Sequence, residues 1–315
     1  MDRLLSAATP AHTNLWRGLG FAGIAYGLWG AFPLYFALLD SVSPVEVVAH
    51  RVIWSLVFLL IVIAFLRGWA SVRSVLRSAR SVALLALAAA AITVNWTTYV
   101  YAVSTDQVVE SSLGYFINPL VSVALGVVVL REKLRGAQWG AVSLATLGVI
   151  IIGIGSGATP VIGLTLAFSF GTYGLVKKIA GVDAIPSLTI ETAMLFPIAA
   201  VVLAVAEING SAAFVIDGIG ITVLLVLLGP ITAVPLLAYV AAANRLPLST
   251  LGITQYLTPT VLFILGLTVF GESVTVTEWS GFIVIWLALI WFTIDLYRHS
   301  RRPTRAQELE VTEPT

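Results

Sequence analysis

The second half of this chain repeats the first half 140 residues later, and this repeat limits the fold more than any other feature. Four residues show the register: Pro119, Gly126, Glu132 and Trp139 recur as Pro259, Gly266, Glu272 and Trp279. Each half contains five long apolar segments, and because five is odd, the two copies must cross a bilayer in opposite senses. Inverted repeats are typical of secondary transporters, which hold their substrate between the halves near the membrane midplane.

The composition indicates a membrane protein. Of 315 residues, 59% are hydrophobic and only 10% are charged, and the mean hydropathy is +1.00. A soluble protein of this length keeps more charge on its surface. The apolar runs are about 20 residues long, the length that a helix needs to cross roughly 30 Å of hydrocarbon. The chain is therefore predicted to be an all-α polytopic membrane protein.

We predict ten transmembrane helices in two inverted five-helix repeats. The expected spans are 18–38, 46–66, 81–101, 109–130, 137–154, 160–177, 187–206, 219–242, 248–270 and 275–295. The predicted divisions are a cytoplasmic N-terminus at 1–17, a first repeat at 18–154, a second repeat at 160–297 and a cytoplasmic disordered tail at 298–315. Residues 69–80, between spans two and three, fit either a short amphipathic helix on the inner leaflet or a solvated basic loop.

The basic residues set the predicted orientation. With the N-terminus inside, every one of the 17 lysines and arginines except Arg51 falls in a terminal segment, in an inward loop or at the inner end of a span. The outward loops hold acidic charges and neither lysine nor arginine. This asymmetry follows the positive-inside rule and predicts that both termini are cytoplasmic. The excess of Arg over Lys, with abundant Ala and Val, favours a bacterial source, so we expect the bacterial inner membrane.

Polar side chains within three predicted spans mark a candidate substrate site, because a polar residue at membrane depth needs a partner or an aqueous cavity. They are Asn95, Trp96 and Tyr99 in span three, Tyr115 and Asn118 in span four, and Gln255 and Thr258 in span nine. The span-four pair lies 140 residues before the span-nine pair. The repeat therefore predicts that both pairs line one cavity at mid-depth.

A proline follows each of these polar stripes. Pro119 cannot donate a hydrogen bond to the Tyr115 carbonyl, and Pro259 likewise deprives the Gln255 carbonyl of its helical donor. A bare carbonyl at membrane depth is tolerated only against protein or a water-lined cavity. Each helix is predicted to offer a free acceptor to a substrate, with a simple kink satisfied by a neighbouring Ser or Thr as the alternative.

Aromatic residues of other spans extend the candidate set. Tyr26 and Trp29 in span one either form an aromatic wall of the cavity or pack against lipid and core. Tyr173 in span six is a further candidate for substrate binding, and Tyr239 in span eight is expected to border the same space.

Four ionisable residues are candidates for coupling or gating, with interfacial charges as the alternative. Arg51 in span two and Glu191 in span seven occupy equivalent positions of the repeat, so they should lie at similar depth in opposite leaflets and not pair with each other. His50 adjoins Arg51. Lys177 lies one turn after Tyr173 and could also snorkel to the inner surface.

No catalytic, cofactor or metal site is predicted, and the chain is not expected to be an enzyme. It has no HExxH, P-loop or Rossmann pattern, it has no cysteine, and its basic residues form no patch for a nucleic acid. The expected partners are a small-molecule substrate and the lipid bilayer. A homodimer is left open.

The chain resembles the EamA-like branch of the drug/metabolite transporter superfamily and, within it, is most similar to the RarD group. The resemblance covers roughly residues 18–297. It is carried by the stretch 115–119, the run 132–148, their second-half echoes over 256–279, and the pair at 50–51. It implies a ten-helix permease that exports small polar or amphipathic metabolites or drugs by alternating access.

Two rival functions stay open. A lipid or lipid-linked-sugar translocase would use the same inverted repeat for a larger substrate. An intramembrane enzyme would need a nucleophile beside a base, and only His50 could supply a histidine for it. A scaffold or receptor would have no need of duplicated kinks at mid-depth.

Overall fold

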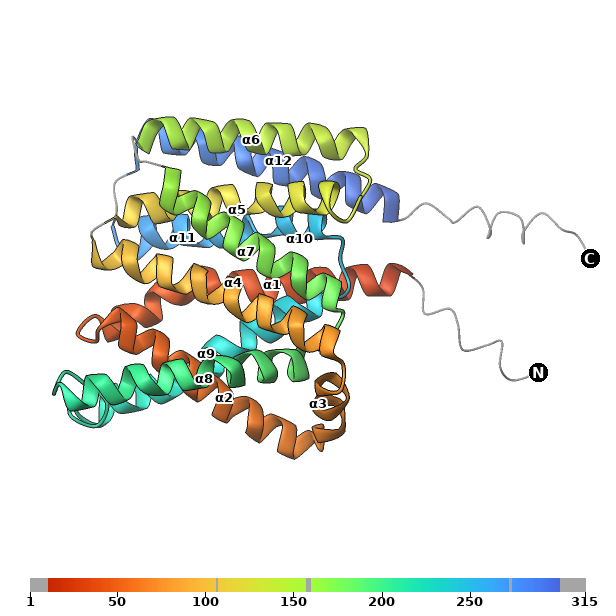
Figure 1. Ribbon diagram of the computed structural model, residues 1–315. Helices are drawn as coiled ribbons and strands as arrows, with labels where there is room; N and C mark the ends of the chain where they lie inside the picture. The colour runs from red at the N-terminus through yellow and green to blue at the C-terminus, as the bar shows by residue number, and fades with distance from the viewer. Residues whose placement is uncertain (1–10, 106, 157–159, 272–273, 301–315) are drawn as a thin grey trace, which may run out of the picture.

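Figure 1 shows the computed structural model of the chain, which describes residues 11–105, 107–156, 160–271 and 274–300. Within these residues all regular secondary structure is helical, as expected of a chain that must satisfy its backbone hydrogen bonds within lipid. The helices are α1 (Ala11–Phe36), the 3₁₀ turn η1 (Ala37–Leu39), α2 (Pro44–Leu66), α3 (Trp69–Leu76), α4 (Ala79–Ser104), α5 (Val108–Val128), α6 (Gly136–Ser156), α7 (Pro160–Ala180), α8 (Ala184–Ile208), α9 (Ile219–Ala243), α10 (Leu248–Thr254), α11 (Leu257–Thr268) and α12 (Val276–Ser300).

Among the described residues, 9 segments are long and apolar enough to cross a membrane, and α10 with α11 counts as one of them. The predicted sixth span is not in this set. It forms α7, a helix of 21 residues whose last turn contains Lys177 and Lys178, and these charges lower its mean hydropathy. Because α7 packs between α4 and α5 (Figure 1), its polar residues Ser169, Tyr173 and Lys177 are buried in protein. The tenth span stays a prediction.

The loops that carry the basic residues gather at one end of the bundle, which we call the basic end. It contains α3 and the loops at 131–135, 181–183 and 244–247, together with the start of α1 and the end of α12 (Figure 1). Residues 69–76 form α3, as in the helical alternative. Val72 of this helix is buried with Ile63, Leu85 and Ile190, which fixes α3 against α2, α4 and α8.

Helices of one half pack against their own counterparts in the other half. Such contacts join α2 to α8, α5 to α10 and α6 to α12, and in Figure 1 α6 and α12 lie side by side and run in opposite directions. The Tyr256 hydroxyl donates to the Phe116 carbonyl at 3.2 Å, and these two residues are 140 positions apart. The two halves therefore meet at equivalent residues, one on α5 and one in the turn before α11.

The predicted span at 248–270 is not one continuous helix. The helix stops after Thr254, Gln255 and Tyr256 form a turn, and α11 begins at Leu257. The equivalent helix α5 continues through Pro119 without a break.

Parts of three predictions fall on residues that the structure does not describe. The predicted disordered tail at 298–315 lies outside the described residues from residue 301 onward, and the predicted N-terminal segment at 1–17 lies outside them up to residue 10. Glu272, one of the repeated residues, also lies outside them.

Candidate functional site

A cavity of about 200 Å³ lies where the two halves meet. Its walls come from α1, α2, α4, α5, α7, α9, α11 and the turn between α10 and α11. The lining residues are Trp29, Phe32, Pro33, Phe36, Arg51, Ile92, Asn95, Trp96, Tyr99, Ser111, Gly114, Tyr115, Asn118, Leu166, Phe170, Leu236, Gln255, Thr258 and Leu262. Several lie near the ends of α1 and α4 and the start of α5, so the cavity extends from the middle of the bundle toward the end opposite the basic end.

The structure brings nine of the sequence-predicted site residues to this cavity: Trp29, Arg51, Asn95, Trp96, Tyr99, Tyr115, Asn118, Gln255 and Thr258. Two pairs among them are repeat counterparts, since Tyr115 and Gln255, and likewise Asn118 and Thr258, are 140 residues apart. The cavity therefore lies between the two halves, and the first half supplies more of its wall than the second.

The polar groups of the wall differ in how they are engaged. Asn95 donates through Nδ2 to the Leu166 carbonyl at 2.9 Å and to Ser169 Oγ at 3.1 Å, which ties α4 to α7. Thr258 Oγ1 donates to the Tyr26 carbonyl at 3.0 Å. By contrast, the buried Oδ1 of Asn118 has no hydrogen-bond partner within the described part of the chain. A buried acceptor without a partner costs free energy, so Asn118 is suited to a donor supplied by a bound molecule.

Arg51 supplies the positive charge of the cavity. Its Nε donates to Thr232 Oγ1 at 3.1 Å. The guanidinium carbon lies 4.6 Å from the ring centroid of Trp96, and 5.8 and 5.9 Å from those of Phe36 and Phe32. No carboxylate among the described residues forms an ion pair with it. The charge is thus held by ring faces and one hydroxyl.

Three predicted substrate residues, Tyr26, Tyr173 and Tyr239, are absent from the cavity wall. They are at most 2% exposed and form an aromatic cluster, in which the Tyr173 and Tyr239 rings stack at 5.8 Å and Tyr26 meets Tyr239 at 6.2 Å. Trp29 and Phe170 belong to both the cluster and the wall. Tyr173 and Tyr239 lie near the basic end of α7 and α9, and Tyr26 lies one turn closer to that end of α1 than the wall residue Trp29, so the cluster borders the cavity on that side.

Lys177 does not snorkel to the surface, contrary to one of the two expectations. Its side chain is 0% exposed and its ammonium group contacts both Ser187 and Glu191, whose side chain is 2% exposed. Ser187 Oγ also donates to Glu191 Oε1 at 3.0 Å. The hairpin between α7 and α8 brings the lysine and the glutamate together, and the sequence signal that could have identified the pair is that both lie in the helical turns next to this short loop.

His50 is buried but does not line the cavity. It accepts at Nδ1 from Trp54 Nε1 at 3.1 Å, and its Nε2 lies 3.6 Å from Glu46 Oε1. The same Glu46 oxygen accepts from the backbone N–H of Ala213 at 2.9 Å. This arrangement fixes the start of α2 to the loop before α9.

The prediction of a free Gln255 carbonyl is wrong. This oxygen accepts a hydrogen bond from the Thr258 N–H at 3.0 Å, because the break between α10 and α11 tightens the chain into a turn. The proline is thus accommodated by ending one helix and starting another. What Gln255 offers to the cavity is its side chain.

The sequence did not identify the residues that hold the basic end together. Glu132 accepts hydrogen bonds from the backbone N–H groups of Leu248 and Ser249 at 2.6 and 2.9 Å, which stabilises the start of α10. Lys178 Nζ donates to the Leu246 carbonyl and to that of Ala243, the latter at 3.2 Å. Glu132 thus joins the two halves, while Lys178 joins the end of α7 to the loop at 244–247 of the same half. The only sequence signal at these residues was the recurrence of Glu132 in the repeat.

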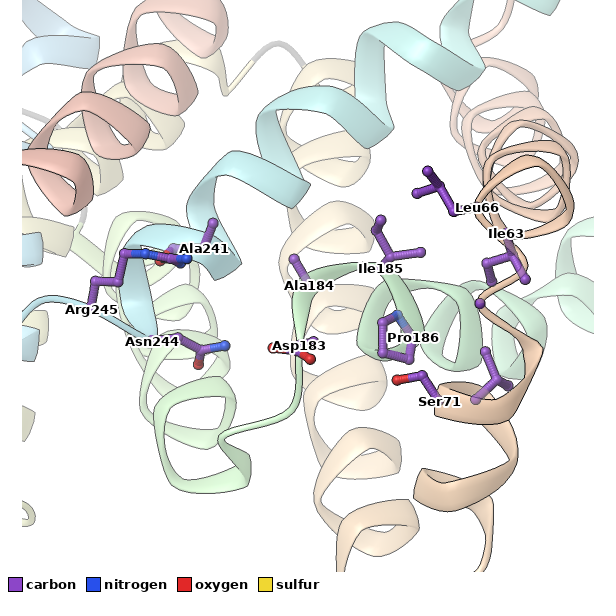
Figure 2. Close-up of a pocket in the computed structure, with 12 residues that line it drawn as sticks. Ile63, Leu66, Ser71, Asp183, Ala184, Ile185, Pro186, Ala241, Asn244 and Arg245 are labelled. Carbon is purple, nitrogen blue, oxygen red and sulfur yellow. The ribbon is translucent and has the colours of Figure 1, made fainter. Parts of the chain in front are cut away.

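A second cavity, of about 350 Å³, lies at the basic end between the end of α2, α3, the start of α8 and the end of α9 (Figure 2). In Figure 2, Ile185 and Pro186 lie between Ile63 on one side and Arg245 on the other. None of the sequence-predicted site residues lines this cavity. Equivalent residues of the two halves and convergent polar groups distinguish the central cavity, which is therefore the candidate site.

Comparisons with known proteins agree with this architecture. The EamA-like transporter family matches residues 16–154. Protein RarD of Streptomyces exfoliatus is 45% identical over 99% of this chain and 97% of its own length. The uncharacterized transporter YojE of Bacillus subtilis is 41% identical over 92% of this chain and 98% of its own length. A crystal structure at 15% identity superposes with a TM-score of 0.69 over 90% of this chain and 99% of that chain, which is a likeness of fold alone.

Proposed function

The chain belongs to the EamA-like transporter family and to its RarD group, and we propose that it is a secondary transporter that exports small polar or amphipathic metabolites or drugs by alternating access. The observation that carries the proposal is the central cavity, whose wall includes both members of two repeat-related pairs. A substrate held there touches both halves at once. A tilt of one half against the other can then change which side of the membrane the substrate faces.

The cavity favours a small solute over the alternative of a lipid or a lipid-linked sugar. Its volume is about 200 Å³, below the range of roughly 300–1,000 Å³ typical of sites for drug-sized ligands. Aromatic rings supply its apolar area, while Asn118, Gln255 and Arg51 supply polar groups that can orient a solute. The intramembrane enzyme has no support here, because His50 lies outside the wall.

We further propose that ten helices span the bacterial inner membrane as inverted five-helix repeats, with both termini and the basic end in the cytoplasm. The contacts between counterpart helices and the antiparallel course of α6 and α12 support the inversion. The gathering of basic loops at one end supports the orientation. In this arrangement the described conformation is closed toward the cytoplasm by the tyrosine cluster, with Lys177 and Glu191 behind it.

Thiol labelling tests the topology, because the chain contains 0 native cysteines. Single cysteines at the exposed positions Arg73 and Lys133 should resist a membrane-impermeant thiol reagent in intact cells and react after lysis. Cysteines at the exposed positions Asp40 and Asp217 should react in intact cells. Labelling with the opposite pattern would reverse the proposed orientation.

Substrate protection tests the site. Compounds that raise the thermal stability of the purified protein in a screen of metabolites and antibiotics should slow the thiol labelling of Tyr115→Cys, a cavity position that is 36% exposed. They should not slow the labelling of Ile150→Cys, which is 50% exposed on α6 away from the cavity. The same compounds should be taken up by proteoliposomes that contain the protein. Binding without protection at Tyr115 would place the site elsewhere.

A further inference from the structure

The charge of the cavity identifies the kind of solute that it takes, and this step rests on the proposed function. Two buried acidic residues could be expected to neutralise Arg51: Glu46 lies on the same helix, and Glu191 is its counterpart in the repeat. Each of them is engaged elsewhere. Glu191 contacts Lys177, and Glu46 accepts from the N–H groups of Ala213 and Phe214. In the part of the chain that the structure describes, the Arg51 guanidinium therefore keeps its charge without a carboxylate partner.

The remaining donors of Arg51 are available to a bound molecule. A guanidinium carries five N–H groups, and only the Nε–H makes a hydrogen bond with a described side chain, that of Thr232. The planar fork of the other two nitrogens matches a carboxylate, which can accept two parallel hydrogen bonds from it. An unpaired charge within a membrane protein is costly and marks a functional site by default. An anion in the cavity would remove this cost.

The rest of the wall fits a planar apolar body. Phe32, Phe36 and Trp96 surround the guanidinium, and Trp29 and Phe170 close the far side. An apolar cavity of about 150 Å³ holds one benzene molecule. At about 200 Å³, this cavity has space for one ring and a small charged group beside it, while the unpartnered Oδ1 of Asn118 can accept a hydrogen bond from a hydroxyl or amide of the solute.

We propose that the transported solute is a small organic monoanion with an aromatic or similarly flat apolar body, and that Arg51 binds its acidic group. The cavity combines one positive charge, three rings around it and a limited volume. Among solutes with the same ring, it should therefore select by the charge of the head group.

Three probes of nearly equal size test the proposal: phenylacetate, phenylacetamide and phenethylamine, which are anionic, neutral and cationic at neutral pH. Binding to the full-length protein in lipid nanodiscs is followed by tryptophan fluorescence, since Trp29 and Trp96 line the cavity. The anion should bind at least about tenfold more tightly than the amide, because hydrogen bonds to charged groups are the stronger ones. The amine should bind most weakly.

Variants assign the preference to one residue. Arg51→Gln should bind phenylacetate and phenylacetamide with similar affinity, and Arg51→Lys should retain part of the preference for the anion. The control is Arg245→Gln, which removes an exposed arginine outside the cavity and should leave the preference unchanged. If Arg51→Gln does not fold, the three probes on the unaltered protein still show whether the cavity prefers an anionic, a neutral or a cationic solute.

Tighter binding of the amide or the amine than of the anion would overturn the inference and keep the transport proposal. A preference for the anion that survives in Arg51→Gln would also overturn it. If none of the three probes binds, the inference is wrong, and the transport proposal is then judged by the compound screen and the labelling of Tyr115→Cys.

Discussion

Arg51 and Glu191 occupy the same position in the two repeats but have opposite surroundings. Arg51 lines the central cavity and is held by aromatic rings and Thr232. Glu191 is buried against Lys177 and Ser187, away from the cavity. One charge is thus neutralised by a buried partner, and the other has no carboxylate partner among the described residues. The difference teaches that equivalent positions in a repeat do not give two charges equivalent neighbours.

The largest effect is expected from breaking the neutralised pair. Lys177→Met leaves the Glu191 carboxylate buried without a counter-charge, which should lower the stability by about 3–5 kcal/mol. The measurement is thermal or denaturant unfolding in detergent. The double variant Lys177→Met with Glu191→Leu should recover most of the loss, because a buried pair can be replaced by apolar side chains at little cost. A single variant as stable as the parent would show that the pair is not a structural element.

Arg51→Gln should separate binding from stability. It removes one hydrogen bond and the ring contacts of the guanidinium, but it also removes a costly charge that has no carboxylate partner among the described residues, so the stability should change by no more than about 1–2 kcal/mol. Transport of the solute identified by screening should be abolished at unchanged membrane abundance. If this variant unfolds as readily as Lys177→Met, the contrast between the two charges fails.

The neutral polar groups of the cavity should have smaller effects on affinity. Asn118→Ala and Gln255→Ala each remove one hydrogen-bonding group from the wall, which should weaken solute binding about two- to tenfold, equal to roughly 0.5–1.5 kcal/mol. Titration of the purified variants with the solute measures the change, and the unfolding midpoint serves as the control. Unchanged affinity in both variants would restrict the site to Arg51 and the aromatic rings.

An effect of similar size, but on stability alone, is expected at the contact between the halves. Tyr256→Phe removes the hydroxyl that donates to the Phe116 carbonyl, so the stability should fall by about 0.5–1.5 kcal/mol. Affinity for the solute should not change, because Tyr256 does not line the cavity. A clear loss of affinity with intact stability would mean that this contact positions Gln255, the residue before it.

The sequence predicted the helices and nine residues of the cavity wall because both follow from hydrophobic length and from the repeat. Once Asn118 and Thr258 are recognised as counterparts, the repeat by itself predicts that both line one cavity. The positions of Tyr26, Tyr173 and Tyr239 could not be predicted in this way, since the side of a helix that faces a cavity depends on tilts and crossings set by packing. The pairing of Lys177 with Glu191 depends likewise on how α7 and α8 meet.

The break at Gln255 shows a different limit. The rule that proline deprives a carbonyl of its donor is local, and it is satisfied by a kinked helix or by two helices joined by a turn. α5 continues through Pro119 as one helix and α10–α11 is divided by a turn, although both contain proline at the same position. A local rule on proline therefore does not decide between the two outcomes.

A cavity lined by equivalent residues of two proposed inverted repeats has a consequence for the orientation of whatever it holds. If the two halves were identical, an asymmetric molecule would fit in two opposite orientations of equal energy, and its polar end would have no fixed direction. In this chain Tyr115 corresponds to Gln255 and Asn118 to Thr258, so the two walls differ in size and in hydrogen-bonding groups. Because the duplicated halves have diverged, the two orientations of a bound molecule differ in energy, and the two walls of the cavity are chemically distinct.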